Sequence, residues 1–124
     1  MPLMKVRLEL ARNSEFPEGS SAHGYEINAP LTEDGHISKQ VWREHAADCS
    51  VRRFCGDEDE EHGRLIHIGD QWVFHYTGME EDDDEPVFRM SQHVFVPNEY
   101  ISITEHDGEQ RAFKVVSVTP SPLD

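Results

Sequence analysis

Apolar and polar side chains alternate along two N-terminal segments, residues 4–10 and 24–29. A period of two is typical of strands with one buried face and one solvated face. The connecting segment at residues 13–21 carries Ser, Pro and Gly and predicts a loop that is too long to show whether the two strands pair. The side chains expected on the buried faces are Met4, Val6, Leu8 and Leu10 in the first strand and Tyr25, Ile27 and Ala29 in the second.

The hydrophobic period then changes from two to three and four. This spacing predicts an amphipathic helix over about residues 38–48. Ser38 suits the N-cap, because its hydroxyl can accept a hydrogen bond from a free backbone N–H. Trp42 lies on the apolar stripe and would pack the helix against the sheet. Gly56 is the latest residue at which this helix can end.

A β-hairpin is predicted around Gly69-Asp70, which suits a two-residue turn. The flanking segments, residues 64–68 and 71–76, are rich in β-forming residues. This register places five side chains on one face of the hairpin, namely Leu65, His67, Trp72, Phe74 and Tyr76.

A second hairpin surrounds Asp107-Gly108. A two-residue loop would split the apolar residues of its strands between two faces. A three-residue loop, His106-Asp107-Gly108, keeps them together if Gly108 adopts the left-handed conformation. We therefore expect one apolar surface formed by Ile101, Ile103, Phe113 and Val115. Further short strands are expected at residues 87–90 and 94–96, the latter before a turn at Pro97-Asn98.

These segments amount to six to eight short strands and one helix. Strands joined by hairpins are antiparallel, and a twisted antiparallel sheet of this size tends to curl, because closure removes its edges. We therefore predict a mainly β (α+β) fold, a small antiparallel β-barrel or strongly curled sheet with one packed helix. The length of 124 residues fits a single domain, 1–124.

Acidic residues dominate the charge of the chain, which is −14 at pH 7. Much of this charge lies in two runs that predict solvated acidic loops at residues 57–62 and 80–86. An acidic surface disfavours binding to nucleic acid and to anionic membranes. The sequence has no apolar run long enough to cross a membrane and does not begin with a signal-peptide pattern. A cytoplasmic protein is therefore expected, with Cys49 and Cys55 reduced.

Four residues form a weak pattern for a zinc site: His45, Cys49, Cys55 and His62. The spacing between the two cysteines departs from the close pairs of zinc ribbons and fingers. The more ordinary interpretation is that Cys49 is a small core residue and Cys55 belongs to the helix exit. The acidic runs lack the glycine and glutamate positions of a calcium-binding EF-hand loop. We therefore expect no metal and no cofactor.

Two classes of function are compatible with this sequence. The first is a non-catalytic binding or interaction module, in which aromatic residues anchor a partner and acidic rims select a basic one. Its candidate contact residues are Trp72, His75, Tyr76 and Tyr100, although Trp72 also suits the core.

The alternative is a small enzyme with a hydrolytic or metal-assisted site built from clustered His and carboxylates. No nucleophile elbow, phosphate-binding glycine loop or HExxH motif supports it. It requires a pocket in which a carboxylate meets at least two of His45, His67, His75, His93 and His106.

Overall fold

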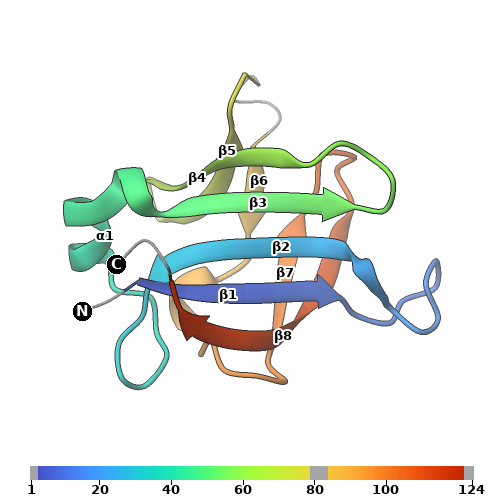
Figure 1. Ribbon diagram of the computed structural model, residues 1–124, viewed down its shortest axis with the longest axis horizontal. Helices are drawn as coiled ribbons and strands as arrows, with labels where there is room; N and C mark the ends of the chain where they lie inside the picture. Colours follow the sequence, from blue (N-terminus) through green and yellow to red (C-terminus); the bar gives the residue numbers. More distant parts are fainter. Residues whose placement is uncertain (1–2, 79–83, 122–124) are drawn as a thin grey trace.

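The computed structural model describes residues 3–78 and 84–121. Within these residues, eight antiparallel strands form a closed barrel in which each strand pairs with its neighbours along the chain and β8 pairs with β1 (Figure 1). The predicted small antiparallel barrel with one helix is confirmed. The strands are β1 (Leu3–Leu10), β2 (Ser20–Pro30), β3 (Ser50–Cys55), β4 (Glu61–Ile68), β5 (Gln71–Tyr76), β6 (Glu85–Val87), β7 (Tyr100–Thr104) and β8 (Gln110–Pro120).

Alternating side chains from all strands fill the interior of the barrel. An eight-stranded barrel is just wide enough for its interior to be packed by side chains. Aromatic rings occupy its middle, where Tyr25 packs against Phe74 and Phe113 with ring centroids 5.2 and 5.1 Å apart. β1 and β2 do pair, and Val6 lies opposite Ile27 in that ladder, both of them buried.

One end of the barrel, which we call the helix end, is covered by α1 (Lys39–His45) and the 3₁₀ turn η1 (Ala46–Asp48) (Figure 1). The predicted cap is present, because the Ser38 hydroxyl accepts from the Val41 backbone N–H. Trp42 donates its Nε1–H to the carbonyl of Leu65 at 2.8 Å and meets Trp72 edge-on. Within the described residues no helix has the length and apolar character needed to cross a membrane.

Both predicted hairpin registers are confirmed. Gly69 has a φ of 60° in the two-residue turn between β4 and β5, and Asp70 has no positive φ, as a type II′ turn requires. Gly108 has a φ of 82° in the three-residue loop between β7 and β8. The four apolar residues expected on one surface of the second hairpin are all buried: Ile101, Ile103, Phe113 and Val115.

The strand predictions were wrong in three places. β3 was missed, because its inward-facing Arg53 interrupts the apolar alternation and the segment was assigned to the helix exit. The segment at residues 94–96 forms no strand. The strand expected at 87–90 is instead β6, which ends at Val87, and a 3₁₀ turn η3 (Met90–Gln92) follows it.

The acidic runs also differ from the expected loops at residues 57–62 and 80–86. The first run begins in an exposed turn, but Glu61 is half-buried at the start of β4. The second run ends with Glu85, which starts β6 and is 0% exposed. Residues 79–83 lie outside the described residues. The last acid of each run therefore belongs to the barrel, because it has partners inside it.

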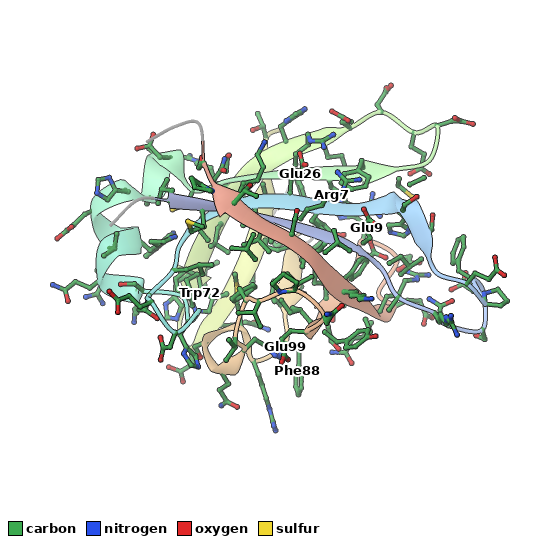
Figure 2. All side chains as sticks on the ribbon, turned by 60° about the horizontal axis from the view of Figure 1, so that its bottom comes forward. Arg7, Glu9, Glu26, Trp72, Phe88 and Glu99 are labelled. Atoms are coloured by element: carbon green, nitrogen blue, oxygen red, sulfur yellow. The ribbon has the colours of Figure 1, made fainter. Side chains whose placement is uncertain are left out.

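Ion pairs cover part of the outer wall of the barrel (Figure 2). Arg7 of β1 bonds Glu9 at 2.8 Å and Glu26 of β2 at 3.2 Å. Arg7 and Arg52 both lie over the ring of Phe54, an outward-facing residue of β3, at 4.6 and 5.0 Å from its centroid. The charged side chains of this outer face are solvated and form ion pairs with one another. The buried polar groups lie on the interior face instead.

Candidate functional site

The end of the barrel opposite α1, which we call the mouth, gathers polar side chains from five elements. Odd-numbered strands end there and even-numbered strands begin there, because all neighbours are antiparallel. Residues far apart in the sequence therefore meet inside the mouth. They are His23 of β2, Arg53 of β3, Glu61 of β4, Glu85 of β6 and Glu105 just after β7.

Glu105 is the most heavily bonded carboxylate of the mouth. Its Oε2 accepts from Tyr25 at 2.9 Å and from Arg53 at 3.1 Å, and it lies 2.8 Å from His23 Nε2. Its Oε1 accepts from Arg111 at 3.0 Å. Burial alone would raise the pKa of Glu105, but the hydrogen bonds from His23 and Tyr25 and the nearby Arg53 charge lower it to about 2. Glu105 is therefore an ionised anchor for the cluster.

Glu85 is the second buried carboxylate, and its surroundings are less polar. Its Oε1 lies 2.9 Å from the hydroxyl oxygen of Tyr25 and accepts from the hydroxyl of Tyr76 at 2.7 Å. Its Oε2 accepts from the backbone N–H of His106 at 3.0 Å and lies 3.4 Å from Arg53 Nε. Burial away from water outweighs these contacts and raises the pKa of Glu85 above its ordinary value.

Glu61 links this cluster to the rim of the mouth. Its Oε1 accepts from Arg53 at 3.3 Å, and its Oε2 lies 2.6 Å from His106 Nε2. The His106 ring in turn packs edge-on against Tyr76. Arg53 thus contacts three carboxylates, those of Glu61, Glu85 and Glu105.

A pocket of about 360 Å³ opens at this cluster. Arg111 forms one wall and is bound by Glu15 at 3.1 Å and Asp107 at 2.9 Å. The hydrogen bond from Arg111 lowers the pKa of Asp107 to about 2. Glu58 and the half-exposed ring of Phe16 complete the lining near the surface. Because carboxylates already neutralise the arginines of the pocket, its remaining charge is negative.

One thiol and two imidazoles of the pocket lining are candidates for a nucleophile and its general base. Cys55 is the thiol on its wall, and burial raises the pKa of that thiol, which keeps it protonated. His23 and His106 each direct Nε2 at a carboxylate of the chain. The described residues of the pocket therefore contain no nucleophile activated by a neighbouring base.

The structure does not bring the four predicted contact residues together. Tyr76 belongs to the buried mouth cluster, whereas Trp72 is buried at the helix end. His75 faces outward opposite Arg64, with its Nδ1 2.6 Å from Asp84. Tyr100 is 54% exposed on the outer wall.

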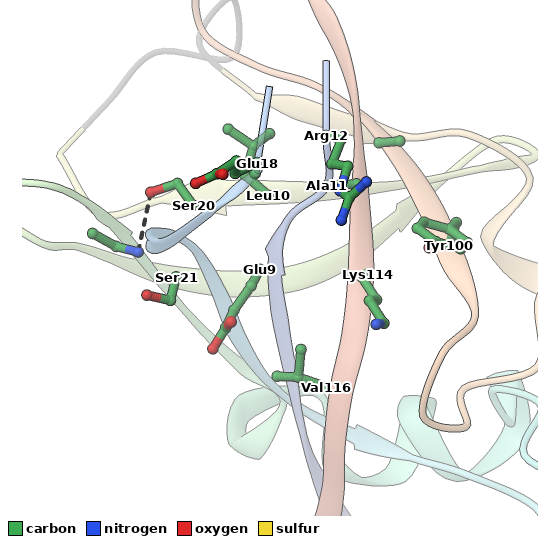
Figure 3. Close-up of a pocket in the computed structure, with 13 residues that line it drawn as sticks. Glu9, Leu10, Ala11, Arg12, Glu18, Ser20, Ser21, Tyr100, Lys114 and Val116 are labelled. Atoms are coloured by element: carbon green, nitrogen blue, oxygen red, sulfur yellow. Dashed lines mark hydrogen bonds between the residues drawn. The ribbon is translucent and has the colours of Figure 1, made fainter. Parts of the chain in front are cut away.

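Tyr100 borders an open groove of about 1040 Å³ on that wall (Figure 3). Its charges are mixed, because Glu9 and Glu18 share the lining with Arg12 and Lys114. The groove thus offers an aromatic contact, but it has no strong preference for a charged partner.

The residues of the weak zinc pattern are also scattered. Cys49 is buried at the helix end and Cys55 lies at the mouth, so the length of β3, about 20 Å at 3.3 Å per residue, separates them. His45 is exposed on α1, and His62 is exposed on β4. No cluster of metal-binding type occurs among residues 3–78 and 84–121. Cys55 is a strand residue and not part of a helix exit.

Of the five histidines named for an enzyme site, His106 lines the mouth pocket, and His23 joins it without having been foreseen. The missed residues follow a simple signal: each extends the inward-facing alternation of its strand by one step. His23 precedes Tyr25 by two residues, and Glu105 follows Ile103 by two. Polar residues at inward positions near one end of the barrel therefore marked the site.

Comparisons with protein-family models, with curated proteins and with solved structures gave no match. The function must therefore be argued from the geometry of the mouth.

Proposed function

We propose that this chain is a non-catalytic binding module that accepts a basic segment of a partner protein at its acidic mouth. The observation that carries this proposal is the pocket of about 360 Å³, whose arginines are already neutralised by carboxylates of the same chain. Its unbalanced charge is negative, so a Lys or Arg side chain is the complementary occupant.

The rim of the pocket supplies the contacts such a side chain needs. Glu58 and Glu15 lie on the rim, and the ring of Phe16 is 37% exposed beside them. A cation over an aromatic face gains electrostatic attraction in addition to its ion pairs. The exposed acidic turn at residues 57–60 extends the negative potential outward and would speed the approach of a basic partner.

The buried cluster below the pocket supports this role by holding the walls in place. Arg53 ties β3 to β4, β6 and the residue after β7 through its three carboxylate contacts. A wall fixed before binding loses little conformational freedom when a partner arrives. The proposed partner is thus met by a preformed surface.

The enzyme alternative is supported by one observation: His23 and His106 meet carboxylates at the same pocket. It is the weaker proposal, because the Nε2 atom of each ring faces a carboxylate of the chain rather than the pocket solvent.

We also propose a cytoplasmic location without binding to nucleic acid or membranes. The two thiols, Cys49 and Cys55, are free, as is usual for a protein of a reducing compartment. They lie at opposite ends of β3. The negative charge of the chain disfavours phosphate backbones and anionic lipids.

The proposal is tested with a short oligoarginine peptide titrated into the full chain by calorimetry. Glu58→Gln should weaken binding about threefold, the size expected for losing one exposed ion pair. Glu44→Gln removes the same charge from α1 at the other end of the barrel and should leave the affinity unchanged.

Equal losses in the two variants would show that binding follows the overall charge and not the mouth. Absence of peptide binding at low salt would refute the proposal outright. Cleavage of the peptide by the natural chain, lost in His106→Gln, would instead favour the enzyme alternative.

A further inference from the structure

The hydroxyl of Tyr25 lies between two buried carboxylates. Its oxygen is 2.9 Å from Glu85 Oε1 and 2.9 Å from Glu105 Oε2, which are both hydrogen-bond distances. A hydroxyl has one proton and can donate it to one of these oxygens. If both carboxyl groups were ionised, the other oxygen would face the Tyr25 oxygen with no proton between them. Each short contact therefore needs its own proton.

We propose that Glu85 and Glu105 hold one bound proton between them through Tyr25 at neutral pH. The proton resides on Oε1 of Glu85, which donates to the Tyr25 oxygen, and Tyr25 donates its own proton to Oε2 of Glu105. This arrangement gives each of the two contacts one proton and leaves one negative charge on the pair. It rests on the buried cluster alone and does not depend on the proposed function.

The positions of the neighbouring donors assign the proton to Glu85. Oε2 of Glu85 faces the His106 backbone N–H at 3.0 Å and Arg53 Nε at 3.4 Å, so this oxygen remains an acceptor. Oε1 faces the hydroxyls of Tyr25 and Tyr76. A hydroxyl oxygen can accept a hydrogen bond, so a protonated Oε1 has a partner to which it can donate.

Glu105, by contrast, faces positive charge on both of its oxygens. Arg53 donates to Oε2 at 3.1 Å and Arg111 donates to Oε1 at 3.0 Å. The directions of the two pKa shifts agree with this assignment, because that of Glu85 is raised and that of Glu105 is lowered. Two acids whose environments separate their pKa values in this way divide the roles of proton holder and anion.

Every packed element that faces this pair contributes to its charge balance. The pair is surrounded by donors and cations from five strands or their ends. Further carboxylates contact these groups in turn: Glu61 contacts Arg53 and His106, and Glu15 and Asp107 contact Arg111. The facing groups are His23 and Tyr25 of β2, Arg53 of β3, Glu61 of β4, Tyr76 of β5, His106 of the β7–β8 loop and Arg111 of β8.

The shared proton makes the cluster a pH-sensitive latch between β6 and the β7–β8 hairpin. The folded-state pKa of Glu85 is raised, so the stability it contributes is present at low pH and is lost as the pH rises through that pKa. Loss of the proton adds a second negative charge across one hydroxyl. The hydrogen bond from the His106 backbone to Glu85 joins the β7–β8 loop to β6. Once Glu85 and Glu105 are both ionised, their repulsion opposes this link.

The test is carbon NMR of the full chain with labelled glutamate side-chain carboxyls, followed from acid to alkaline pH. At pH 7 one glutamate carboxyl, assigned to Glu85 through its own side-chain connectivity, should keep the shift of a protonated acid. Glu105 should show the shift of an ionised carboxylate at the same pH. Ionised shifts for both residues at pH 7 would overturn the proposal.

A matched pair of variants supplies a second readout. Glu85→Gln mimics the protonated acid, so it should fold and should remove the loss of stability with rising pH that the proposal predicts for the natural chain. Glu60→Gln, an exposed change in the first acidic run, should leave that loss in place. An unchanged loss of stability with rising pH in Glu85→Gln would assign the proton elsewhere and contradict the proposal.

Discussion

The two ends of this barrel are closed by different physical means. At the helix end, Trp42 and Trp72 meet edge-on with ring centroids 5.2 Å apart, and one hydrogen bond to Leu65 fixes the indole. At the mouth, Arg53 and the carboxylates around it form a buried ionic cluster in place of an apolar plug. Closure of a barrel therefore does not itself require charges.

This difference supports the proposal that the mouth is the functional end of the barrel. Burial of apolar rings is favourable and non-directional, whereas buried charges must recover a desolvation cost through good geometry and are often no better than an apolar core. The helix end achieves closure without that cost. The proposed binding role and the proposed shared proton would each give Glu85 and Glu105 a role in the mouth beyond stability.

The largest effect is expected at the helix end. Trp72→Ala should lower the free energy of unfolding by about 3–5 kcal/mol, the usual cost of emptying a buried tryptophan site. Urea unfolding measures this loss. Ile68→Ala on the same hairpin is the control, because Ile68 is exposed and its loss should change stability by about 0.5 kcal/mol or less. A smaller cost for Trp72→Ala than for changes at the mouth would reverse the comparison.

At the mouth, Glu105→Gln should cost about 3 kcal/mol at neutral pH, because it leaves Arg53 and Arg111 without their buried carboxylate. The amide keeps the size of the side chain, so the loss reports charge and not volume. Glu109→Gln, in the same hairpin but exposed, should change stability little in the same urea experiment. Equal effects of the two changes would mean that the cluster contributes no specific charge pairing.

Acid should distinguish the two ends further. The folded-state pKa of Glu105 is about 2, below its ordinary value of 4.5, so its contribution is present above 4.5 and is lost as the pH falls toward 2. Between pH 6 and pH 3 this group should remove about 2 kcal/mol of stability. Glu105→Gln should lack that part of the decline, whereas Trp72→Ala should retain it, as followed by urea unfolding at each pH. A decline of equal size in all three proteins would assign it to other carboxyls.

Much of the barrel could be predicted from the sequence because its strands obey local rules. Alternation located β1 and β2, and the glycines at 69 and 108 set the registers of both hairpins. β3 escaped because Arg53 occupies an inward position, where an alternation of apolar residues was expected. The strand expected at 94–96 failed for the opposite reason, since Phe95 is buried and bonds the Gly35 carbonyl without joining a strand ladder.

The candidate site was harder to predict, because its geometry depends on closure of the barrel. Glu85 and Glu105 belong to segments that appear solvated in the sequence, and only the antiparallel order of the strands brings them to one tyrosine. Tyr76 was singled out from the sequence, but as a surface contact and not as a buried hydrogen-bond donor. Long-range pairing of this kind leaves no local pattern beyond an acid at an inward position.

The smallest effect concerns the turns that the two ends share. Gly108 at the mouth and Gly69 at the helix end both have positive φ, and no atom lies within 4 Å of the position that a Cβ would take at either residue. Alanine at either position therefore strains the backbone without a steric clash. Each change should lower the free energy of unfolding by about 1 kcal/mol. Thermal unfolding of the two variants measures this cost. Gly108 lies beside Asp107 and Arg111, which form an ion pair at the mouth. If the Gly108 variant loses much more stability than the Gly69 variant, this ion pair, and not the turn alone, depends on the loop.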